Sequence, residues 1–293
     1  MKGLAVVTGA TGMVGRAIVE ELLKKGFAVR VLTRKLDFKD SRVQIINGEL
    51  LDPVAVSALL EDANHLFHCA AELSDETQMW AVNSEATLLL ISLAEKVPSL
   101  SYICHLSSVG VIGKFSGRVA DELTICNPVN TYEKSKLAAE DFVKKYKGQA
   151  RVIILRPTNV ISKEKNPLNS LGFLKVLIKG GEHAHFVHAF DVAAAACFFV
   201  DHPSKVSPDC FIVSCDQEPM NTIAGTLAIC KGKVQPLMHA PWQLAYFLRR
   251  ILKGPINRGD VIYASDKLIS AGFVYPLGLL GAIREICGIA GKR

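Results

Sequence analysis

TGATGMVG, at residues 8–15, places three glycines at Gly-x-x-Gly-x-x-Gly spacing directly after the apolar run Leu4–Thr8. The apolar run predicts a buried strand, and the residues around the third glycine continue with a helical period. Glycines permit the positive φ of a tight turn, let a phosphate approach the backbone and let the helix pack closely on the strand. Because a helix N-terminus also attracts anions, these residues predict a dinucleotide-binding turn. A tight strand–helix turn without a ligand is the plainer alternative.

Short β-branched runs alternate with helical periods along the first two-thirds of the chain. This alternation predicts βαβ units around a parallel sheet. We therefore expect an α/β fold, a Rossmann-type doubly wound parallel sheet with a small, mostly helical C-terminal substrate lobe. The predicted strands are Leu4–Thr8, Ala28–Thr33, Val43–Asn47, His65–Cys69, Tyr102–Leu106, Val152–Leu155 and Cys210–Ser214. The predicted helices are Met13–Lys25, Pro53–Leu60, Trp80–Val97, Tyr132–Tyr146, Asp191–Asp201, Asn221–Cys230 and Pro241–Leu252.

The alternation loosens after Asn159, where a polar segment with Pro and Asn predicts a loop. No linker separates the parts, so close packing is expected. Residues 1–158 are predicted to form the NAD(P)-binding Rossmann core, with residues 186–215 returning to it. Residues 159–185 and 216–293 are predicted to form the small substrate-binding lobe.

Composition excludes several classes of protein. The chain has 293 residues, of which 49% are hydrophobic and 21% charged, which excludes general disorder. Eight scattered Cys without a Cys-x-x-Cys pair predict reduced thiols in a cytoplasmic protein, and neither Cys nor His forms a metal-ligand pattern. The net charge is +6, which we interpret as dispersed Lys and Arg, and 7% of the residues are aromatic. Both values give nucleic-acid binding little support. No apolar run is long enough for a transmembrane helix.

The end of the second predicted strand bears on the choice of cofactor. NAD-preferring proteins usually place Asp or Glu there to bind the ribose 2′-hydroxyl, whereas this chain has Thr33, Arg34 and Lys35. A cation can bind a 2′-phosphate that a carboxylate would repel. NADP is therefore the predicted cofactor and NAD the alternative. The plainer interpretation is that the two cations are simply exposed on a loop.

Tyr132 and Lys136 lie four residues apart, on one face of a predicted helix. A tyrosine is a poor acid or base at neutral pH because its pKa is near 10. A nearby ammonium stabilises the phenolate and lowers that pKa, so the pair is a candidate for general acid–base catalysis. The spacing alone is common by chance, and it gains significance from the glycine turn in the same chain.

Together these features resemble the extended short-chain dehydrogenase/reductase family (NAD-dependent epimerase/dehydratase family), in its nucleotide-sugar branch. The resemblance spans nearly the whole chain. The matching segments are residues 8–15, Gly48–Asp52, His68–Ala71, Val82–Asn83, Leu106–Ser108, Tyr132–Lys136, Leu155–Val160, Ser265–Lys267 and Ala271–Pro276.

The resemblance implies roles for individual residues. Ser108 would hydrogen-bond the substrate oxygen, Tyr132 would exchange its proton, and Lys136 would bond the nicotinamide ribose. Asp52 would meet the adenine, and Asn83 would brace the central helix. The residues implied in cofactor binding are Gly9, Thr11, Gly12, Met13, Val14, Gly15, Thr33, Arg34, Leu51, Asp52, Cys69, Ala70, Ala71, Asn83, Tyr132, Lys136 and Pro157.

Several of these residues also have a plainer interpretation. Asp52 precedes Pro53 and could merely cap the next helix. The choice of Ser108 over Ser107 rests on family register alone. Asn83 lies in a predicted helix and could be ordinary helix surface.

The residues after Ser108 narrow the reaction that the resemblance implies. Sugar dehydratases of the family carry Asp-Glu there, whereas Val109 and Gly110 cannot transfer protons. Asn159 matches the place where nucleotide-sugar members use Asn near the substrate pyrophosphate, although Asn is also common in turns. With NADPH as the expected cofactor, this predicts reduction of a ketone on a nucleotide-linked sugar. The alternatives are a nucleotide-sugar 4-epimerase, a reductase of a sterol-like or lipid-linked ketone, and a non-catalytic NADP sensor.

Residues 241–252 predict an aromatic, apolar helix with Arg249-Arg250 near its end. Such a helix could dock on a membrane surface or on a second subunit, which would make a homodimer. The favoured interpretation is that it belongs to the core of the small lobe. The expected partner is therefore a small-molecule substrate, without nucleic acid or membrane.

Overall fold

The computed structural model of the chain describes residues 2–35, 40–164, 176, 178, 180–215, 217–230, 232, 239–253 and 257–288. Its centre is a seven-stranded sheet with the strand order β10-β7-β5-β4-β1-β2-β3, in which all neighbours are parallel. The strands are β1 (Leu4–Thr8), β2 (Ala28–Thr33), β3 (Gln44–Asn47), β4 (His65–His68), β5 (Tyr102–Leu106), β7 (Arg151–Pro157) and β10 (Asp209–Val213). The predicted Rossmann-type parallel sheet is confirmed.

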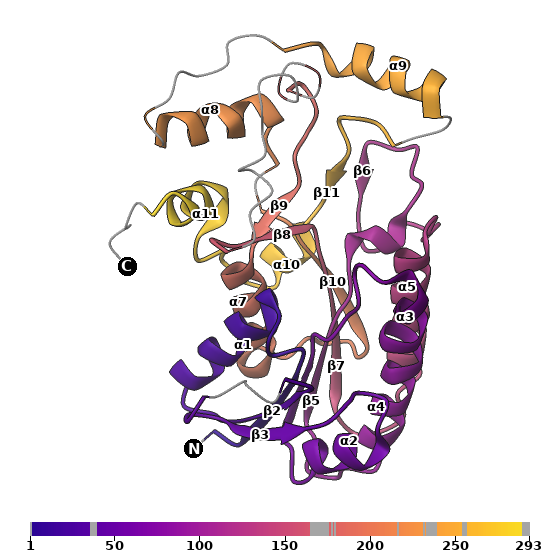
Figure 1. Cartoon of the computed structure of the whole chain (residues 1–293), viewed down its shortest axis with the longest axis vertical. Helices are drawn as coiled ribbons and strands as arrows, with labels where there is room; N and C mark the ends of the chain where they lie inside the picture. The colour runs from indigo at the N-terminus through magenta and orange to yellow at the C-terminus, as the bar shows by residue number, and fades with distance from the viewer. Residues whose placement is uncertain are drawn as a thin grey trace.

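Helices cover both faces of this sheet (Figure 1). On one face α1 packs against α7, and on the other lie α2, α4 and α5. Each face has its own hydrophobic core, because strands covered on both sides are apolar throughout. The helices are α1 (Met13–Lys24), α2 (Pro53–Leu60), α4 (Ala86–Ala94), α5 (Thr131–Lys144) and α7 (Ala189–Asp201).

Side chains at the helix ends explain where two of these helices begin. The Asp52 carboxylate accepts a hydrogen bond from the Val54 amide at 2.9 Å, and Pro53 occupies the first turn of α2. Asn130 and Glu133 form a reciprocal capping box at the start of α5. The second cap fixes the helix that carries the predicted catalytic pair.

The predicted helix Trp80–Val97 is three elements instead of one. α3 (Glu76–Trp80) begins earlier because Asp75 caps it, a π-helical turn follows at Ala81–Glu85, and α4 continues from there. Helical turns of the π type are rare and often mark functional sites. Here the turn carries Asn83, whose side chain has no exposed surface.

The other described elements lie mostly beyond the carboxyl edge of the sheet (Figure 1). Strands β8 and β9 form one small parallel pair, and β6 and β11 form another. Much of the predicted lobe segment 159–185 lies outside the described residues. The elements are β6 (Val119–Ala120), β8 (Asn159–Ile161), β9 (Phe186–His188), α8 (Met220–Cys230), α9 (Trp242–Lys253), β11 (Ile262–Tyr263), α10 (Asp266–Ser270) and α11 (Gly278–Ile286).

The helix predicted over residues 241–252 is present as α9, but its apolar side chains do not all enter a core. Leu244, Phe247 and Ile251 are 52%, 61% and 66% exposed. The expectation that this helix is core is wrong for these three residues, because they share the face turned away from the protein. No helix in the described part of the chain has the length and apolarity that a membrane span needs.

Candidate active site

Two cavities meet over the glycine turn. The first, of about 320 Å³, is lined by residues that follow β1, β2 and β4. The second, of about 640 Å³, is lined by residues at the ends of β5 and β7 and at the start of α5. Gly9, Gly12, Cys69 and Ala71 line both cavities, so the two form one groove. An extended ligand such as a dinucleotide suits a groove across the carboxyl ends of parallel strands.

The glycine turn leaves no room for side chains. A Cβ atom at Gly9, whose φ is +71°, would lie 2.6 Å from the backbone nitrogen of Ala70. A Cβ atom at Gly15 would collide with the carbonyl oxygen of Gly9. α1 follows Gly12 without a side-chain cap, so no capping side chain satisfies its leading N–H groups. A bare backbone turn beside an uncapped helix N-terminus fits the pyrophosphate of a dinucleotide.

Most of the residues predicted to bind the cofactor or substrate line this groove. Asp52 and Asn83 line neither cavity: Asp52 caps α2, as its plainer interpretation had it, and Asn83 is buried. The remaining residues are Thr11, Thr33, Arg34, Leu51 and Ala70 in the first cavity, and Met13, Val14, Gly15, Ser108, Tyr132, Lys136, Pro157 and Asn159 in the second.

The end of β2 presents two cations, Arg34 and Lys35, to the first cavity. Thr33 is buried, and its hydroxyl accepts a hydrogen bond from the Lys35 amide at 3.0 Å. Arg34 between them is exposed and lines the cavity, where its planar guanidinium can bind a phosphate through two N–H groups. Glu49 and Glu72 line the same cavity, so its rim carries both signs of charge.

A buried hydrogen-bonded chain supports the floor of the groove. The Thr8 hydroxyl lies 2.7 Å from His68 Nδ1, and His68 Nε2 lies 2.8 Å from the Thr87 hydroxyl. Because the Thr87 hydroxyl donates to the Asn83 carbonyl oxygen, His68 Nε2 must donate to Thr87, and Nδ1 accepts from Thr8. Thr8 in turn accepts from the amides of residues 69 and 70, which line the groove. Burial lowers the pKa of His68 to about 3, so this histidine stays neutral.

Asn83 joins three segments of the site. Its side chain accepts from the Glu72 amide at 2.7 Å and donates to the Glu72 carbonyl oxygen at 3.0 Å. It also donates to the Ser135 hydroxyl at 3.0 Å, and that hydroxyl donates to the Tyr132 carbonyl oxygen. Asn83 therefore ties the loop after β4 to the helix with the catalytic pair. The π-helical turn that positions it has no signal in the sequence pattern.

Replacing Asn83 by Ala is expected to destabilise the protein by about 1–3 kcal/mol, because the partly buried backbone groups of Glu72 lose their partner and the buried Ser135 hydroxyl loses one of its two. Denaturant unfolding measures this change. Leu88→Ala is the control, since Leu88 is 44% exposed in the helix that follows. Equal midpoints for the two variants would contradict the bracing role.

The structure separates the two serines at the end of β5. The Ser107 hydroxyl is buried and donates to Glu140 at 2.6 Å. The Ser108 hydroxyl accepts from the Gly110 amide at 3.0 Å, and Ser108 lines the larger cavity together with Tyr132. Geometry therefore favours Ser108 as the substrate-binding hydroxyl, a choice that the sequence alone left to family register.

The pKa values of Tyr132 and Lys136 differ from what the spacing of the two residues predicts. Burial raises the pKa of Tyr132 above its ordinary value, and the hydrogen bond with Ser108 opposes only part of that rise. Lys136 is buried and donates to the Leu106 carbonyl oxygen at 2.7 Å, and burial lowers its pKa to about 8. The expected lowering of the Tyr132 pKa by Lys136 is thus absent in this arrangement, because burial dominates. Tyr132 is protonated at neutral pH, which suits a proton donor.

A buried ion pair lies directly behind Ser107. Glu140 and Arg156 are almost wholly buried, with Arg156 Nε 2.9 Å and Nη2 2.7 Å from the two carboxylate oxygens. Lys144 adds a third donor to the carboxylate at 3.1 Å. The pair joins α5 to β7 next to the site. Its only sequence signal is an arginine inside an otherwise apolar strand.

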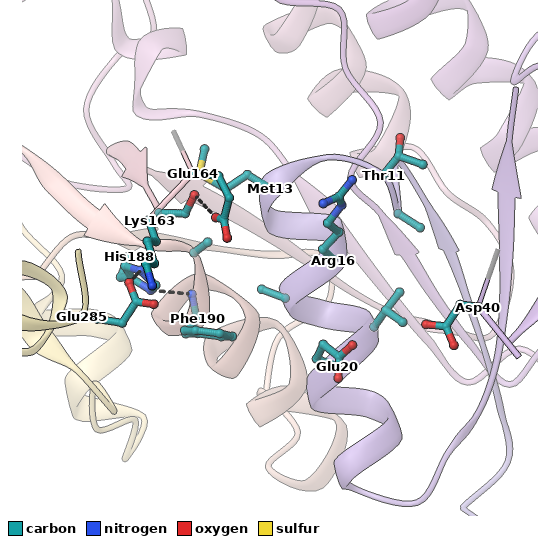
Figure 2. A pocket seen from close by; sticks show the side chains of 15 residues that line it. Thr11, Met13, Arg16, Glu20, Asp40, Lys163, Glu164, His188, Phe190 and Glu285 are labelled. Carbon is teal, nitrogen blue, oxygen red and sulfur yellow. Dashed lines mark hydrogen bonds and ion pairs between the residues drawn. The ribbon is translucent and has the colours of Figure 1, made fainter. Parts of the chain in front are cut away.

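A third cavity, of about 550 Å³, lies beside α1 and shares Thr11 with the first cavity and Met13 with the second (Figure 2). His188 caps α7 through Nδ1, and its Nε2 lies 3.0 Å from the Glu285 carboxylate. Arg16 and Lys163 face the same cavity as several carboxylates, so charge alone selects no class of ligand. In the described part of the chain no three or more His, Cys, Asp and Glu side chains gather as a metal site.

Sequence comparison places the chain among known proteins. Residues 5–213 match the model of the NAD dependent epimerase/dehydratase family. An uncharacterised protein of Sinorhizobium fredii is 28% identical over 207 residues, which cover 65% of this chain and 52% of that protein. The sterol-4-alpha-carboxylate 3-dehydrogenase (decarboxylating) of Dictyostelium discoideum is 26% identical over 184 residues, which cover 56% of each. The chain thus spans about half the length of these two relatives.

Structural comparison gives the same architecture. The UDP-glucuronic acid 4-epimerase of Bacillus cereus, solved in complex with NAD, matches with a TM-score of 0.74 and 19% identity. The match covers 98% of this chain and 98% of that one. At this identity the likeness concerns the fold.

Proposed function

Because the chain belongs to the NAD-dependent epimerase/dehydratase family, we propose that it is an NADP-dependent oxidoreductase that reduces a ketone of a nucleotide-linked sugar. The observation that carries this proposal is the groove that joins the glycine turn to Ser108, Tyr132 and Lys136. In the proposal, residues 1–158 and 186–215 bind the cofactor. Residues 159–185 and 216–293 bind the rest of the substrate.

The residues of the site would hold the ketone and deliver one proton. The nicotinamide cofactor, when bound, supplies a hydride. Ser108 and Tyr132 line the same cavity, so a ketone oxygen between them would meet two hydroxyl donors. Tyr132 gives its proton to that oxygen as the charge develops. The buried Lys136 would bind the nicotinamide ribose, the role that the family resemblance implies for it.

Three features support a nucleotide-linked sugar and net reduction. Asn159 is exposed at the start of β8 and lines the larger cavity, where its amide can donate to a phosphate oxygen. Val109 and Gly110 follow Ser108 in a short 3₁₀ turn, and neither can act as an acid or base for eliminating water. Arg34 supports NADPH, which suits net reduction.

The test is incubation of the protein with NADPH and a panel of 4-keto-6-deoxy nucleotide sugars. Reduction is expected to consume NADPH and to yield a product heavier by one hydride and one proton. Interconversion of 4-hydroxy epimers without net loss of NADPH would replace this proposal by the epimerase alternative. An absence of any turnover with intact NADP binding would favour the non-catalytic sensor.

A sterol-like ketone is the second candidate substrate. Its support is the similarity to the Dictyostelium sterol dehydrogenase, together with Leu73, Met79 and Val160 in the lining of the larger cavity. A panel of 3-keto sterols with NADPH separates the two candidates. Turnover of sterols but of no nucleotide sugar would show that Asn159 does not bind phosphate.

Arg34→Ala is expected to weaken NADPH binding about ten- to a hundredfold and to spare NADH. The physical reason is the loss of a charge-assisted contact to the 2′-phosphate, worth about 1.5–3 kcal/mol. Fluorescence titration with both cofactors measures the effect. Arg250→Ala, an exposed arginine in α9, is the matched control. Equal affinity of the unsubstituted protein for NADPH and NADH would contradict the assignment of NADP.

A further inference from the structure

The outward face of α9 is apolar. Leu244, Phe247 and Ile251 occur at i, i+3 and i+7, which places them on one side of the helix, and each is more than half exposed. Amphipathic helices of globular proteins normally turn such a face toward the core. Here the face lies at one end of the long axis of the molecule, opposite α2 (Figure 1). α8, whose Ile229 is 67% exposed, lies at the same end (Figure 1).

The excess of positive charge in the chain falls within the sequence segment that contains α9. The chain holds 34 Lys and Arg against 28 Asp and Glu. Residues 219–259 contain six of these cations, Lys231, Lys233, Arg249, Arg250, Lys253 and Arg258, and no Asp or Glu. The rest of the chain is therefore balanced at 28 of each sign. The interpretation of the net charge of +6 as dispersed along the chain is therefore wrong, because the whole excess falls in residues 219–259.

The inner side of α9 faces a cavity of about 560 Å³ with cationic and aromatic walls. Arg258 is stacked 5.3 Å from the Trp242 ring, and Asp260 neutralises it through two hydrogen bonds of 2.8 Å. Arg250 donates to the Tyr246 hydroxyl at 3.2 Å. Among the described residues, neither Arg250 nor Lys114, which also lines the cavity, has an acidic partner. This side therefore keeps uncompensated positive charge beside the apolar face.

We propose that the α9 end of the molecule docks on an anionic lipid surface. The face of Leu244, Phe247 and Ile251 would enter the boundary between headgroups and acyl chains, as apolar faces of interfacial helices do. Arg250, which is exposed and has no acidic partner among the described residues, would contact the lipid phosphates. Each cation near an anionic surface strengthens binding about fivefold.

Charge complementarity favours this occupant over a second copy of the chain. Two copies joined through the same face would bring two acid-free segments together, each with six cations. Like charges so close to one another oppose association unless they are screened. An anionic lipid surface removes the same repulsion. The proposal does not depend on the identity of the ketone.

The test is co-sedimentation of the full chain with vesicles. One set is phosphatidylcholine alone, and the other contains about one-third phosphatidylserine. The anionic vesicles are expected to bind at least about tenfold more protein, and Phe247→Glu to reduce that binding about tenfold or more. Val54→Glu is the matched control, because Val54 is 75% exposed on α2 at the opposite end. Ile251→Gln provides a second, uncharged variant of the face, with thermal unfolding as the check that each variant folds.

Three outcomes would overturn the proposal. The first is equal sedimentation with the two vesicle types, or none with either. The second is an equal loss of binding in Phe247→Glu and Val54→Glu, which would make the effect one of charge alone. The third is a dimer, seen by analytical ultracentrifugation, that Ile251→Gln dissociates without a change in vesicle binding, which would assign the face to a second copy.

Discussion

Tyr132→Phe is expected to lower turnover about 10²–10⁴-fold on any ketone that the protein reduces, while NADPH binding stays nearly unchanged. The phenyl ring preserves the packing of the half-buried tyrosine, and only the transferable proton is lost. Ser108 would still hold the ketone oxygen, but the second hydroxyl donor to that oxygen would be gone. Single-turnover kinetics with a saturating substrate measures the chemical step directly. Tyr146→Phe, the same substitution just beyond the end of α5, is the matched control.

The pH dependence of the reaction provides an independent readout of the same role. Burial raises the pKa of Tyr132 above its ordinary value near 10, with only partial opposition from Ser108. Reduction needs the protonated form, so its rate should stay level through neutral pH and fall only as the pH rises through that raised pKa. The reverse reaction needs the tyrosinate and should rise with pH. Wild-type turnover in Tyr132→Phe, or the same high-pH limb in that variant, would remove Tyr132 from the proposed role.

The parallel sheet could be predicted because its signals are local and repeated. The apolar runs mark the strands, the glycines mark the turn after the first strand, and Asp52 followed by Pro53 marks the start of a helix. The same local reasoning could not find the π-helical turn. That turn carries Asn83, whose partners on Glu72 and Ser135 lie far apart in sequence.

The site was predictable in its residue types and less so in its contacts. Sequence spacing brings Tyr132 and Lys136 onto one helix face, but it cannot show that Lys136 donates to Leu106 or that burial governs both pKa values. Ser107 and Ser108 differ because the Ser107 hydroxyl donates to Glu140 behind the strand, a contact that the sequence does not show. The apolar spacing in α9 predicts an amphipathic helix, but it cannot show whether another element covers the apolar face. The exposure of Leu244, Phe247 and Ile251 therefore could not be predicted from the sequence.

Glu140→Gln is expected to destabilise the fold by about 3–5 kcal/mol. The substitution keeps the shape of the side chain but leaves the Arg156 guanidinium, which is 3% exposed, buried without a counter-charge. It also weakens the acceptor that holds the Ser107 hydroxyl. A typical protein is stable by only about 5–15 kcal/mol, so such a loss is large. Denaturant unfolding with Asp141→Asn as the control measures it, since Asp141 is an exposed neighbour on the same helix.

The double variant Glu140→Leu with Arg156→Met tests whether the loss comes from the stranded charge. Apolar side chains in place of both partners leave no buried charge uncompensated, so the double variant should be more stable than Glu140→Gln. The difference in unfolding free energy between the wild-type protein and Glu140→Gln should also depend on pH. Burial raises the pKa of Glu140, but its contacts with Arg156 outweigh this and leave the pKa below its ordinary value. The stabilisation is therefore complete above the pKa of the unfolded chain and declines as the pH falls toward the lowered value. Two results would show that the carboxylate stabilises the fold through packing alone. One is a stability difference between wild type and Glu140→Gln that does not decrease in acid, and the other is a double variant as unstable as Glu140→Gln.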